Sequence, residues 1–298
     1  MSPTLRQLQY FAALAETRHF GRAAERCRVT QPALSMQVRE LEATLGVSLI
    51  ERSAAGLQLT GAGDEVAARA REILVAVRDM TEIARQRAGL LCGPLRLGVI
   101  PSIGPYLLPK VLPALHGSYP DLELSLRESQ TRYLLDDLLA GRLDLLVLAL
   151  PVDGPEVETL RLFEDVFTLA VHPSHPLASR ERVRQADVAP ERLLLLEEGH
   201  CLRDQALALC GSAGAKQTEE FRASSLATVV QMVINGFGCT ILPELALPVE
   251  IGARGGISIV RFAEPPPART VGLAWRASSP RKPDFAEFGR FVAARAAA

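Results

Sequence analysis

The spacing of apolar residues changes once along this 298-residue chain, and that change constrains the fold more than any other feature. Up to about Arg87, apolar residues recur every three or four positions, which is the period of helices. From Gly93 onward, short apolar runs such as LRLGVI, LELSL and LDLLVLAL alternate with helical segments. This alternation is typical of an α/β domain with a parallel sheet. We therefore predict a small helical domain followed by a larger α/β domain.

The helical part divides into a tri-helical unit over residues 1–60 and one long helix within residues 61–90. The long helix carries apolar residues in steps of four and three along one narrow seam: Val66, Ala70, Ile73, Val77, Met80 and Ala84. A seam of this width suits a partner helix. The alternative is that the seam packs onto the second domain of the same chain.

The α/β part, residues 91–298, divides into two similar halves. One half is expected to cover residues 93–163 and 269–298, and the other residues 164–268, with the Pro-rich segment EPPPAR as a crossover between them. Two halves joined by two crossings leave a cleft that is lined by strand ends and helix N-termini. We expect a ligand or reaction site in that cleft.

Residues 20–46 have the form helix, tight turn, helix. Thr30 can cap the second helix, and Pro32 suits its first turn. Pro32, Ser35, Met36 and Arg39 share the stripe opposite the apolar one, as needed for entry into a major groove. Between positions 18 and 39 the chain has five arginines and one acid, although its net charge is −1, which fits a phosphate contact surface. A solvated surface of an ordinary three-helix unit is the alternative.

Composition excludes several classes of protein. With 48% hydrophobic and 22% charged residues, the chain is ordinary for a globular protein. It has no apolar run of 18 residues and no signal-peptide pattern at its start, so we expect a cytoplasmic protein without a membrane segment. Five cysteines without an export signal predict mostly reduced thiols.

The five cysteines have different settings. Cys27 and Cys239 lie in apolar patterns and are expected to be buried, whereas Cys92 at the end of the linker can be either structural or exposed. Cys201 and Cys210 lie in the segment LLLLEEGHCLRDQALALC, where a buried strand leads into the start of a helix. A thiol at a helix N-terminus is favoured as thiolate by the helix dipole, and here also by the nearby His200 and Arg203.

Two cysteines close in sequence are typical of a redox sensor, in which a second thiol traps the sulfenic acid formed by peroxide. On a continuous helix the two would lie about 13 Å apart along the axis, whereas a disulfide needs Cα atoms within about 7 Å. Oxidation would therefore have to melt the helix and could report peroxide as a conformational change. Zinc fits less well because the cysteine and histidine spacing is wrong for it. Two unrelated structural cysteines are the simpler alternative.

Three N-terminal motifs, LRQLQYFAALAE, FGRAAERCRVTQPALSMQVRELEATLGVSLIER and LTGAG, resemble the DNA-binding domain of LysR-type transcriptional regulators. The resemblance implies a winged helix-turn-helix followed by a dimerising linker helix. It also implies that Glu40 and Glu42 lie away from phosphate. The residues expected at DNA are Thr30, Gln31, Pro32, Ser35 and Arg39 of the helix-turn-helix, with Arg52 and Ser53 on the wing.

Four further segments, GVIPSIGPYLLP, ESQTRYLLDDLLAGRLDLLVLAL, GHCLRDQA and FRASSLATVVQMVINGFGCTILP, are similar to peroxide-sensing members of the same family. This resemblance implies a regulatory domain with two α/β subdomains, like the type II periplasmic binding proteins. Cys201 would be the thiol that peroxide oxidises and Cys210 the resolving thiol. The residues expected around the peroxide are Ser102, Thr131, His200 and Arg203.

Without the resemblance, the residue types at these positions give weaker support for a peroxide site. Ser102 and Thr131 lie at strand and helix ends, where a hydroxyl residue is more often a helix cap than a ligand. The family usually has threonine where this chain has Ser102, so loss of the methyl group that restricts the rotamer could shift peroxide sensitivity.

Three functions remain at this point. The first is a regulator, not an enzyme, that binds double-stranded DNA and is switched by hydrogen peroxide, with no cofactor and no metal. The second is a LysR-type regulator that responds to a small metabolite in the cleft. The third is a thiol peroxidase with an accessory DNA domain. The resemblance further implies recruitment of RNA polymerase and a homotetramer that contains dimers formed by the linker helix.

Overall fold

The computed structural model describes residues 2–53, 56–85, 89–209, 216–217, 223–252 and 255–296. These residues form two compact units, Met1–Ala84 and Arg85–Ala298, and each unit has its own hydrophobic core. Over the described ranges, no helix combines the length and the apolar character that crossing a membrane requires.

The first unit consists of three short helices, a hairpin and a long helix. The elements are α1 (Leu5–Thr17), α2 (Phe20–Cys27), α3 (Gln31–Leu45), β1 (Ile50–Ser53), β2 (Gly56–Leu59) and α4 (Gly61–Arg85). The predicted turn between α2 and α3 begins at Arg28, whose left-handed φ of 54° ends α2. β1 and β2 pair as an antiparallel wing. The unit is therefore a winged helix-turn-helix with a long helix after it.

The second unit is built on one large sheet. Its strands are β3 (Gly93–Val99), β4 (Leu122–Glu128), β5 (Leu145–Leu150), β6 (Val157–Val171), β7 (Arg182–Val183), β10 (Thr240–Pro243), β11 (Ser258–Phe262) and β12 (Ala268–Arg276). They follow the order β4-β3-β5-β12-β6-β11-β7, and β10 also pairs with β6. The short strands β8 (Arg192–Leu193) and β9 (Lys216–Gln217) pair separately.

The prediction of a parallel sheet is correct only for part of it. β3 is parallel to β4 and β5, but β12 is antiparallel to both β5 and β6. The reason is the path of the chain, because β12 re-enters the first half of the sheet from the second half and runs in the opposite direction.

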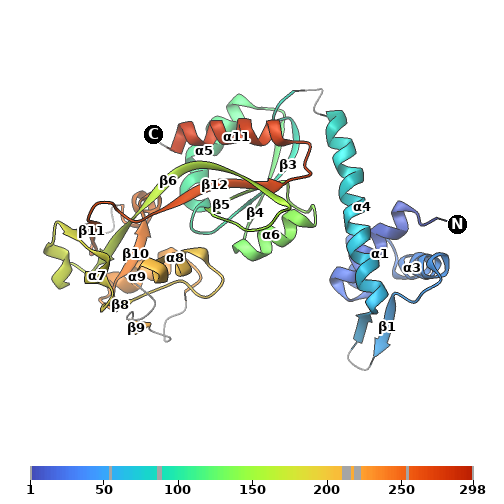
Figure 1. Cartoon of the computed structure of the whole chain (residues 1–298), viewed down its shortest axis with the longest axis horizontal. Helices are drawn as coiled ribbons and strands as arrows, with labels where there is room; N and C mark the ends of the chain where they lie inside the picture. Colours follow the sequence, from blue (N-terminus) through green and yellow to red (C-terminus); the bar gives the residue numbers. More distant parts are fainter. Residues whose placement is uncertain are drawn as a thin grey trace. The chain divides into compact units, whose positions relative to one another are not determined.

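Two long strands divide the second unit into two subdomains (Figure 1). β6 pairs with β12 from Val157 to Val166, and with β10 and β11 from Phe167 to Val171. The first subdomain contains β3, β4, β5, most of β12 and the helices α5 (Gly104–Ser118), α6 (Thr131–Leu139) and α11 (Lys282–Ala296). In Figure 1, α5 and α11 cover one side of its sheet and α6 lies on the other.

The second subdomain contains β7, β10 and β11 with a set of short helices. These are η2 (Pro176–Ser179), α7 (Gln185–Val188), α8 (Cys201–Leu209), α9 (Leu226–Ile234), η3 (Glu244–Ala246) and α10 (Leu247–Glu250). α8 is anchored by the buried side chains of Leu202 and Ala206. The segment before α8 reaches the first subdomain near the start of α6, and this is where the predicted cleft residues meet.

Candidate functional site

Cys201 is the first residue of α8 and carries a free thiol. The side chain is partly buried and packs against the core of the second unit. The hydroxyl of Thr131, the first residue of α6, and the backbone N–H of Leu202 both hydrogen-bond to the sulfur. A thiol on one subdomain is thus held by a hydroxyl from the other.

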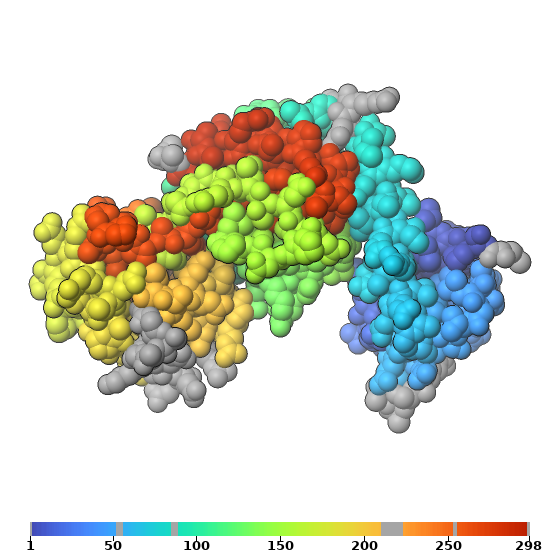
Figure 2. Space-filling view, in the orientation of Figure 1, coloured from blue at the N-terminus to red at the C-terminus, as the bar shows by residue number. Residues whose placement is uncertain are grey.

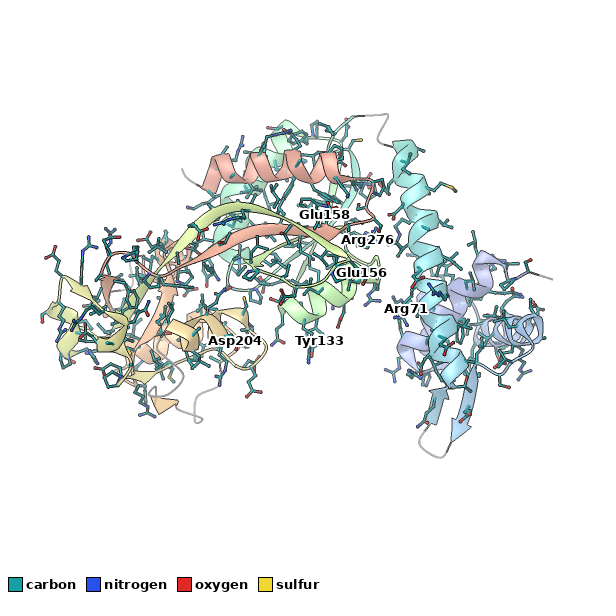
Figure 3. All side chains as sticks on the ribbon, viewed as in Figure 1. Arg71, Tyr133, Glu156, Glu158, Asp204 and Arg276 are labelled. Atoms are coloured by element: carbon teal, nitrogen blue, oxygen red, sulfur yellow. The ribbon has the colours of Figure 1, made fainter. Side chains whose placement is uncertain are left out.

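The charge balance at Cys201 differs from the prediction. Burial raises the pKa of the thiol above its ordinary value, and this outweighs Arg269, Thr131 and Leu202, which lower it. Asp204, one helical turn further along α8 and labelled in Figure 3, also raises this pKa. The expectation of a thiol with a net lowered pKa is therefore wrong, because the helix start lies in a buried position rather than in solvent.

Arg269 on β12 is the central cation of the site, and the sequence analysis did not identify it. Its guanidinium is buried and binds Asp165 on β6, with Nε donating to Oδ2 at 3.0 Å. Nη1 and Nη2 donate to the hydroxyl and the backbone carbonyl of Ser102, each at 2.8 Å. An arginine in a buried strand must have a buried partner, and this rule could have identified both Arg269 and Asp165 from the sequence.

Neither Ser102 nor Thr131 is a helix cap. Ser102 is buried, and the cap residue of α5 is Ile103. Thr131 follows Gln130, the cap residue of α6. The more ordinary interpretation of these two hydroxyls as caps is therefore wrong, because their side chains bind Arg269 and Cys201 instead.

His200 and Arg203 flank the thiol in sequence but have other partners. His200 is buried, and its Nε2 lies 3.7 Å from Glu197 Oε1. Arg203 Nη1 donates to the carbonyl of Leu196 at 3.2 Å. The cation that acts on the thiol is thus Arg269 rather than Arg203, because the Arg203 side chain turns back toward the preceding segment.

Gln130 and Gly199 form a second contact between the subdomains, beside the thiol. Gln130 Nε2 donates to the carbonyl of Glu198 at 3.2 Å. Gly199 has a φ of +91°, and a Cβ there would lie 2.4 Å from Gln130 Oε1. Glycine is required at this position for both reasons. In Figure 2 the light orange segment that contains α8 lies directly beside the green first subdomain.

Gln205, one turn after Cys201 on α8, is another residue that the sequence analysis did not single out. Its Oε1 is buried and has no hydrogen-bond partner within the described ranges. A buried acceptor of this kind can receive a hydrogen bond from a small polar molecule.

The remaining cysteines are placed as follows. Cys210 lies outside the described residues. Cys239 is fully buried, as predicted. Cys27 is only partly buried, and burial raises the pKa of its thiol. Cys92 is also partly exposed, and its thiol donates to the carbonyl of Gly89 at 3.2 Å. In the described part of the chain, no three His, Cys, Asp or Glu side chains gather as metal ligands.

The first unit exposes one face of α3. Pro32 lies in the first turn and Thr30 is the N-cap residue, both as predicted, although the Thr30 side chain makes no capping hydrogen bond. The exposed face forms a hollow lined by Pro32, Ser35, Met36, Arg39, Glu40 and Ala43. Gln31 precedes it and is exposed.

Glu40 and Glu42 differ in their positions. Glu42 Oε1 accepts the N–H of Leu49 at 2.8 Å and so faces the wing rather than the hollow. Glu40 lines the hollow beside Arg39, where its carboxylate accepts from Gln37 Nε2 at 2.8 Å. Arg52 and Ser53 lie in β1, in register with Leu57 and Gly56.

Two of the five arginines between positions 18 and 39 form ion pairs with acidic residues in the structure. Arg26 pairs with Glu16 at 2.6 Å, and Arg18 with Asp64 at 3.4 Å. Arg22, Arg28 and Arg39 are exposed, and none of them has an ion pair with another described residue. These three side chains are therefore available to an anionic partner.

Comparison with protein families and known proteins gives concordant results. Residues 5–64 match the family of bacterial regulatory helix-turn-helix proteins of the lysR family, and residues 88–297 match the LysR substrate binding domain. The chain is 45% identical over 291 residues to the DNA-binding transcriptional dual regulator OxyR of Escherichia coli K12, a match that covers 98% of this chain and 95% of that protein. It is 40% identical to the hydrogen peroxide-inducible genes activator of Haemophilus influenzae, over 93% of this chain and 91% of that one.

Two solved structures are similar over nearly the whole chain. A full-length OxyR variant from Pseudomonas aeruginosa aligns with a TM-score of 0.79 and 38% identity, covering 99% of this chain and 95% of that one. A hydrogen-peroxide-bound OxyR mutant from Corynebacterium glutamicum aligns with a TM-score of 0.67 and 37% identity, over 99% of this chain and 94% of that one.

Proposed function

The chain belongs to the LysR family of bacterial helix-turn-helix regulators, and on that premise we propose that it is a DNA-binding transcription regulator switched by hydrogen peroxide. The observation that carries the proposal is the Cys201 site. A free thiol at the start of α8 is held between a hydroxyl from the other subdomain and a buried arginine. Relatives of this chain are named hydrogen peroxide-inducible genes activators.

The chemistry at Cys201 follows from its partners. The thiolate attacks one oxygen of hydrogen peroxide, the O–O bond breaks, and the products are a sulfenic acid and hydroxide, which takes a proton to give water. The hydroxyls of Ser102 and Thr131 donate to the peroxide oxygens, and Arg269 stabilises the negative charge that moves from sulfur to the leaving oxygen. His200 and Arg203 hold the segment that positions Cys201.

The second step uses Cys210. Its thiol attacks the sulfenic sulfur of Cys201, a disulfide forms, and water leaves, so that two thiols and one peroxide give one disulfide and two waters. Each chain is thus oxidised once per peroxide until the disulfide is reduced again, and we propose that it acts as a regulator rather than as a peroxidase. A cytoplasmic location fits this chemistry, since thiols are kept reduced there between oxidations.

DNA binding is assigned to the exposed face of α3 and to the wing. The side chains that would reach base edges or phosphates are Thr30, Gln31, Pro32, Ser35 and Arg39, with Arg52 and Ser53 on the wing. Arg39 lines the hollow on α3 and, in the described part of the chain, makes no ion pair with an acid. A guanidinium in that position suits a phosphate or a guanine edge.

Dimerisation is assigned to α4. Ile73, Met80 and Ile83 on this helix are 44%, 67% and 56% exposed. A groove beside the helix is lined mainly by apolar side chains, among them Leu5, Leu8, Leu45 and Val66. Exposed apolar surface on this scale is typical of an interface, so we propose a homodimer through α4, and a tetramer through a further surface of the regulatory unit. We also propose that the regulator recruits RNA polymerase, as its resemblance to LysR-type regulators implies.

The test of the peroxide switch is peptide mapping by mass spectrometry after one equivalent of hydrogen peroxide. The wild type should lose two hydrogens in a peptide pair that joins Cys201 to Cys210, and Cys201→Ser and Cys210→Ser should not form this pair. Oxidation that spares Cys201, or that spreads over all five thiols, would contradict the proposal and favour a metabolite-responsive regulator. Consumption of many peroxide equivalents with thioredoxin or glutathione would favour a peroxidase.

The test of the DNA assignment compares three full-length proteins on one operator fragment. Arg39→Ala should weaken binding by about 1–3 kcal/mol and remain a dimer, since it removes one DNA contact. Ile73→Glu should give a lower mass by sedimentation and lose the two-fold footprint, because it places a charge in the apolar groove. An Ile73→Glu protein that stays dimeric would contradict the assignment of α4. Arg26→Ala is the control for Arg39, because Arg26 is paired with Glu16 and lies outside the hollow, and it should bind the operator as the wild type does.

A further inference from the structure

We propose that the hydrogen bond between Tyr106 and Glu250 is a positioning contact for Cys201, because it holds the two subdomains in the arrangement in which Thr131 and Arg269 act on the thiol. The Tyr106 hydroxyl donates to Glu250 Oε1 at 2.7 Å. Tyr106 lies in the first turn of α5, in the first subdomain, and Glu250 ends α10, in the second. The inference rests on the proposed function only in taking Cys201 as the reacting thiol.

The bond joins two side chains that are almost completely buried. Tyr106 is 4% and Glu250 is 5% exposed. A carboxylate in such a place is costly unless it accepts hydrogen bonds, and an O–H donor to a carboxylate forms one of the stronger hydrogen bonds in proteins. Burial and the Glu250 carboxylate both raise the pKa of the Tyr106 hydroxyl, with further effects from Glu128 and Arg269. Separation of the subdomains would leave Glu250 without this donor, so the bond favours the closed arrangement.

A chain of contacts connects this bond to the site. α10 follows η3, where the N–H of Leu245 donates to Asp165 Oδ1 at 3.0 Å. The other oxygen of Asp165 accepts from Arg269, and Arg269 donates to Ser102, two residues before α5 begins. Since α5 carries Tyr106, the contacts close into a ring that runs through both subdomains. Opening the ring at Tyr106 therefore loosens Arg269 and Ser102 together.

The thiol depends on the same arrangement. Thr131 belongs to the first subdomain and Cys201 to the second, so their hydrogen bond exists only while the subdomains stay close. Both Thr131 and Arg269 lower the pKa of Cys201. Burial raises the pKa of Cys201 more than these two groups lower it, so loosening the subdomains, which admits water to the thiol, should lower this pKa. The same loosening removes the Thr131 and Arg269 contacts that assist the reaction with peroxide.

The molecule offers a matched control. Tyr119 donates to Glu287 Oε1, also at 2.7 Å, but this bond joins α5 to α11 within the first subdomain. Tyr119→Phe removes the same hydroxyl from the same kind of bond without crossing between subdomains. Any general effect of losing a tyrosine–glutamate bond should appear in both variants.

The experiment measures the pH profile of Cys201 alkylation by iodoacetamide in full-length protein, with the Cys201 peptide quantified by mass spectrometry. Tyr106→Phe should shift the profile to lower pH and speed alkylation at neutral pH by about three- to tenfold, because loosening relieves the burial that raises the pKa of Cys201. Glu250→Gln keeps the acceptor oxygen and should stay within about twofold of the wild type, as a rescue by the conservative variant. Tyr119→Phe should match the wild type.

The possible results test the positioning role of the Tyr106–Glu250 bond separately from the peroxide switch. A Tyr106→Phe profile equal to that of the wild type, or an equal shift in Tyr119→Phe, would overturn the positioning role. A shift in Glu250→Gln together with an unchanged Tyr106→Phe profile would also overturn it, since the Tyr106 hydroxyl would then not be the cause. A wild-type Cys201 that is alkylated but not oxidised by peroxide would contradict the proposed function and leave the positioning result standing.

Discussion

Replacement of Arg269 by methionine is expected to lower the free energy of unfolding of the regulatory unit by about 3–5 kcal/mol, because it leaves Asp165 buried without its cation. The side chains of Arg269 and Asp165 are 1% and 2% exposed, so water cannot replace the lost partner. The same variant should slow oxidation of Cys201 by about tenfold or more at neutral pH, since the cation that lowers the pKa of this thiol is gone.

The measurements are calorimetric unfolding of the full chain and the pH profile of the peroxide reaction. Burial already places the pKa of Cys201 above its ordinary value, so the wild-type rate should rise with pH through the neutral range, and the Arg269→Met profile should lie at still higher pH. Arg276→Met is the matched control. Arg276, labelled in Figure 3, is a buried arginine on the same strand that donates to the carbonyl of Leu138. Arg276→Met should lower the free energy of unfolding without slowing the oxidation of Cys201. If it slows this oxidation as much as Arg269→Met does, the loss of stability alone would explain the slower rate.

Oxidation is expected to abolish the protection of α8 against hydrogen exchange. The helix runs from Cys201 to Leu209, and the next residue is Cys210. On a continuous helix the two cysteines would be about 13 Å apart along the axis, which is too far for a disulfide. The bridge therefore requires the helix to unwind, and amides over residues 202–209 should exchange at least about tenfold faster, with the buried Leu202 and Ala206 losing their packing.

Hydrogen exchange with mass spectrometry, before and after one equivalent of peroxide, measures this effect. Cys210→Ser is the informative control, because its Cys201 can reach the sulfenic acid but cannot form the bridge. Its α8 peptide should keep the protection of the reduced protein. A wild-type protein that contains the disulfide and still protects α8 would refute the coupling between bridge formation and helix melting.

The sequence was sufficient for the main helices and strands of both units. Apolar spacing located the helices around Leu34 and Val77 and the strands at LRLGVI and LDLLVLAL, because local periodicity reflects which side of an element is buried. The Pro-rich segment was correctly interpreted as a crossover, and it lies between β11 and β12. The direction of β12 was not predictable in this way, since a strand has the same pattern whichever way it runs.

The site was only partly predictable. Cys201, Ser102 and Thr131 were identified from motifs, and in the structure Arg269 acts on Cys201 and binds Ser102, while Thr131 acts on Cys201. Arg203 was chosen as the cation because it is near Cys201 in sequence, and Arg269 was not considered, but the Arg203 side chain binds the carbonyl of Leu196. Cys201 and Arg203 lie two residues apart on α8, and side chains at that spacing on a helix point to different sides.

The sequence by itself determined the two-domain organisation, the helix-turn-helix, and a thiol at the start of a helix, because each depends on residues close together in the chain. Only the tertiary structure decided which cation acts on that thiol, in which direction its pKa moves, and how Tyr106 meets Glu250. Tyr106 and Glu250 are 144 residues apart in sequence, as counted for their hydrogen bond. Burial and long-range charge interactions depend on the packing of both subdomains, and no local pattern contains that information.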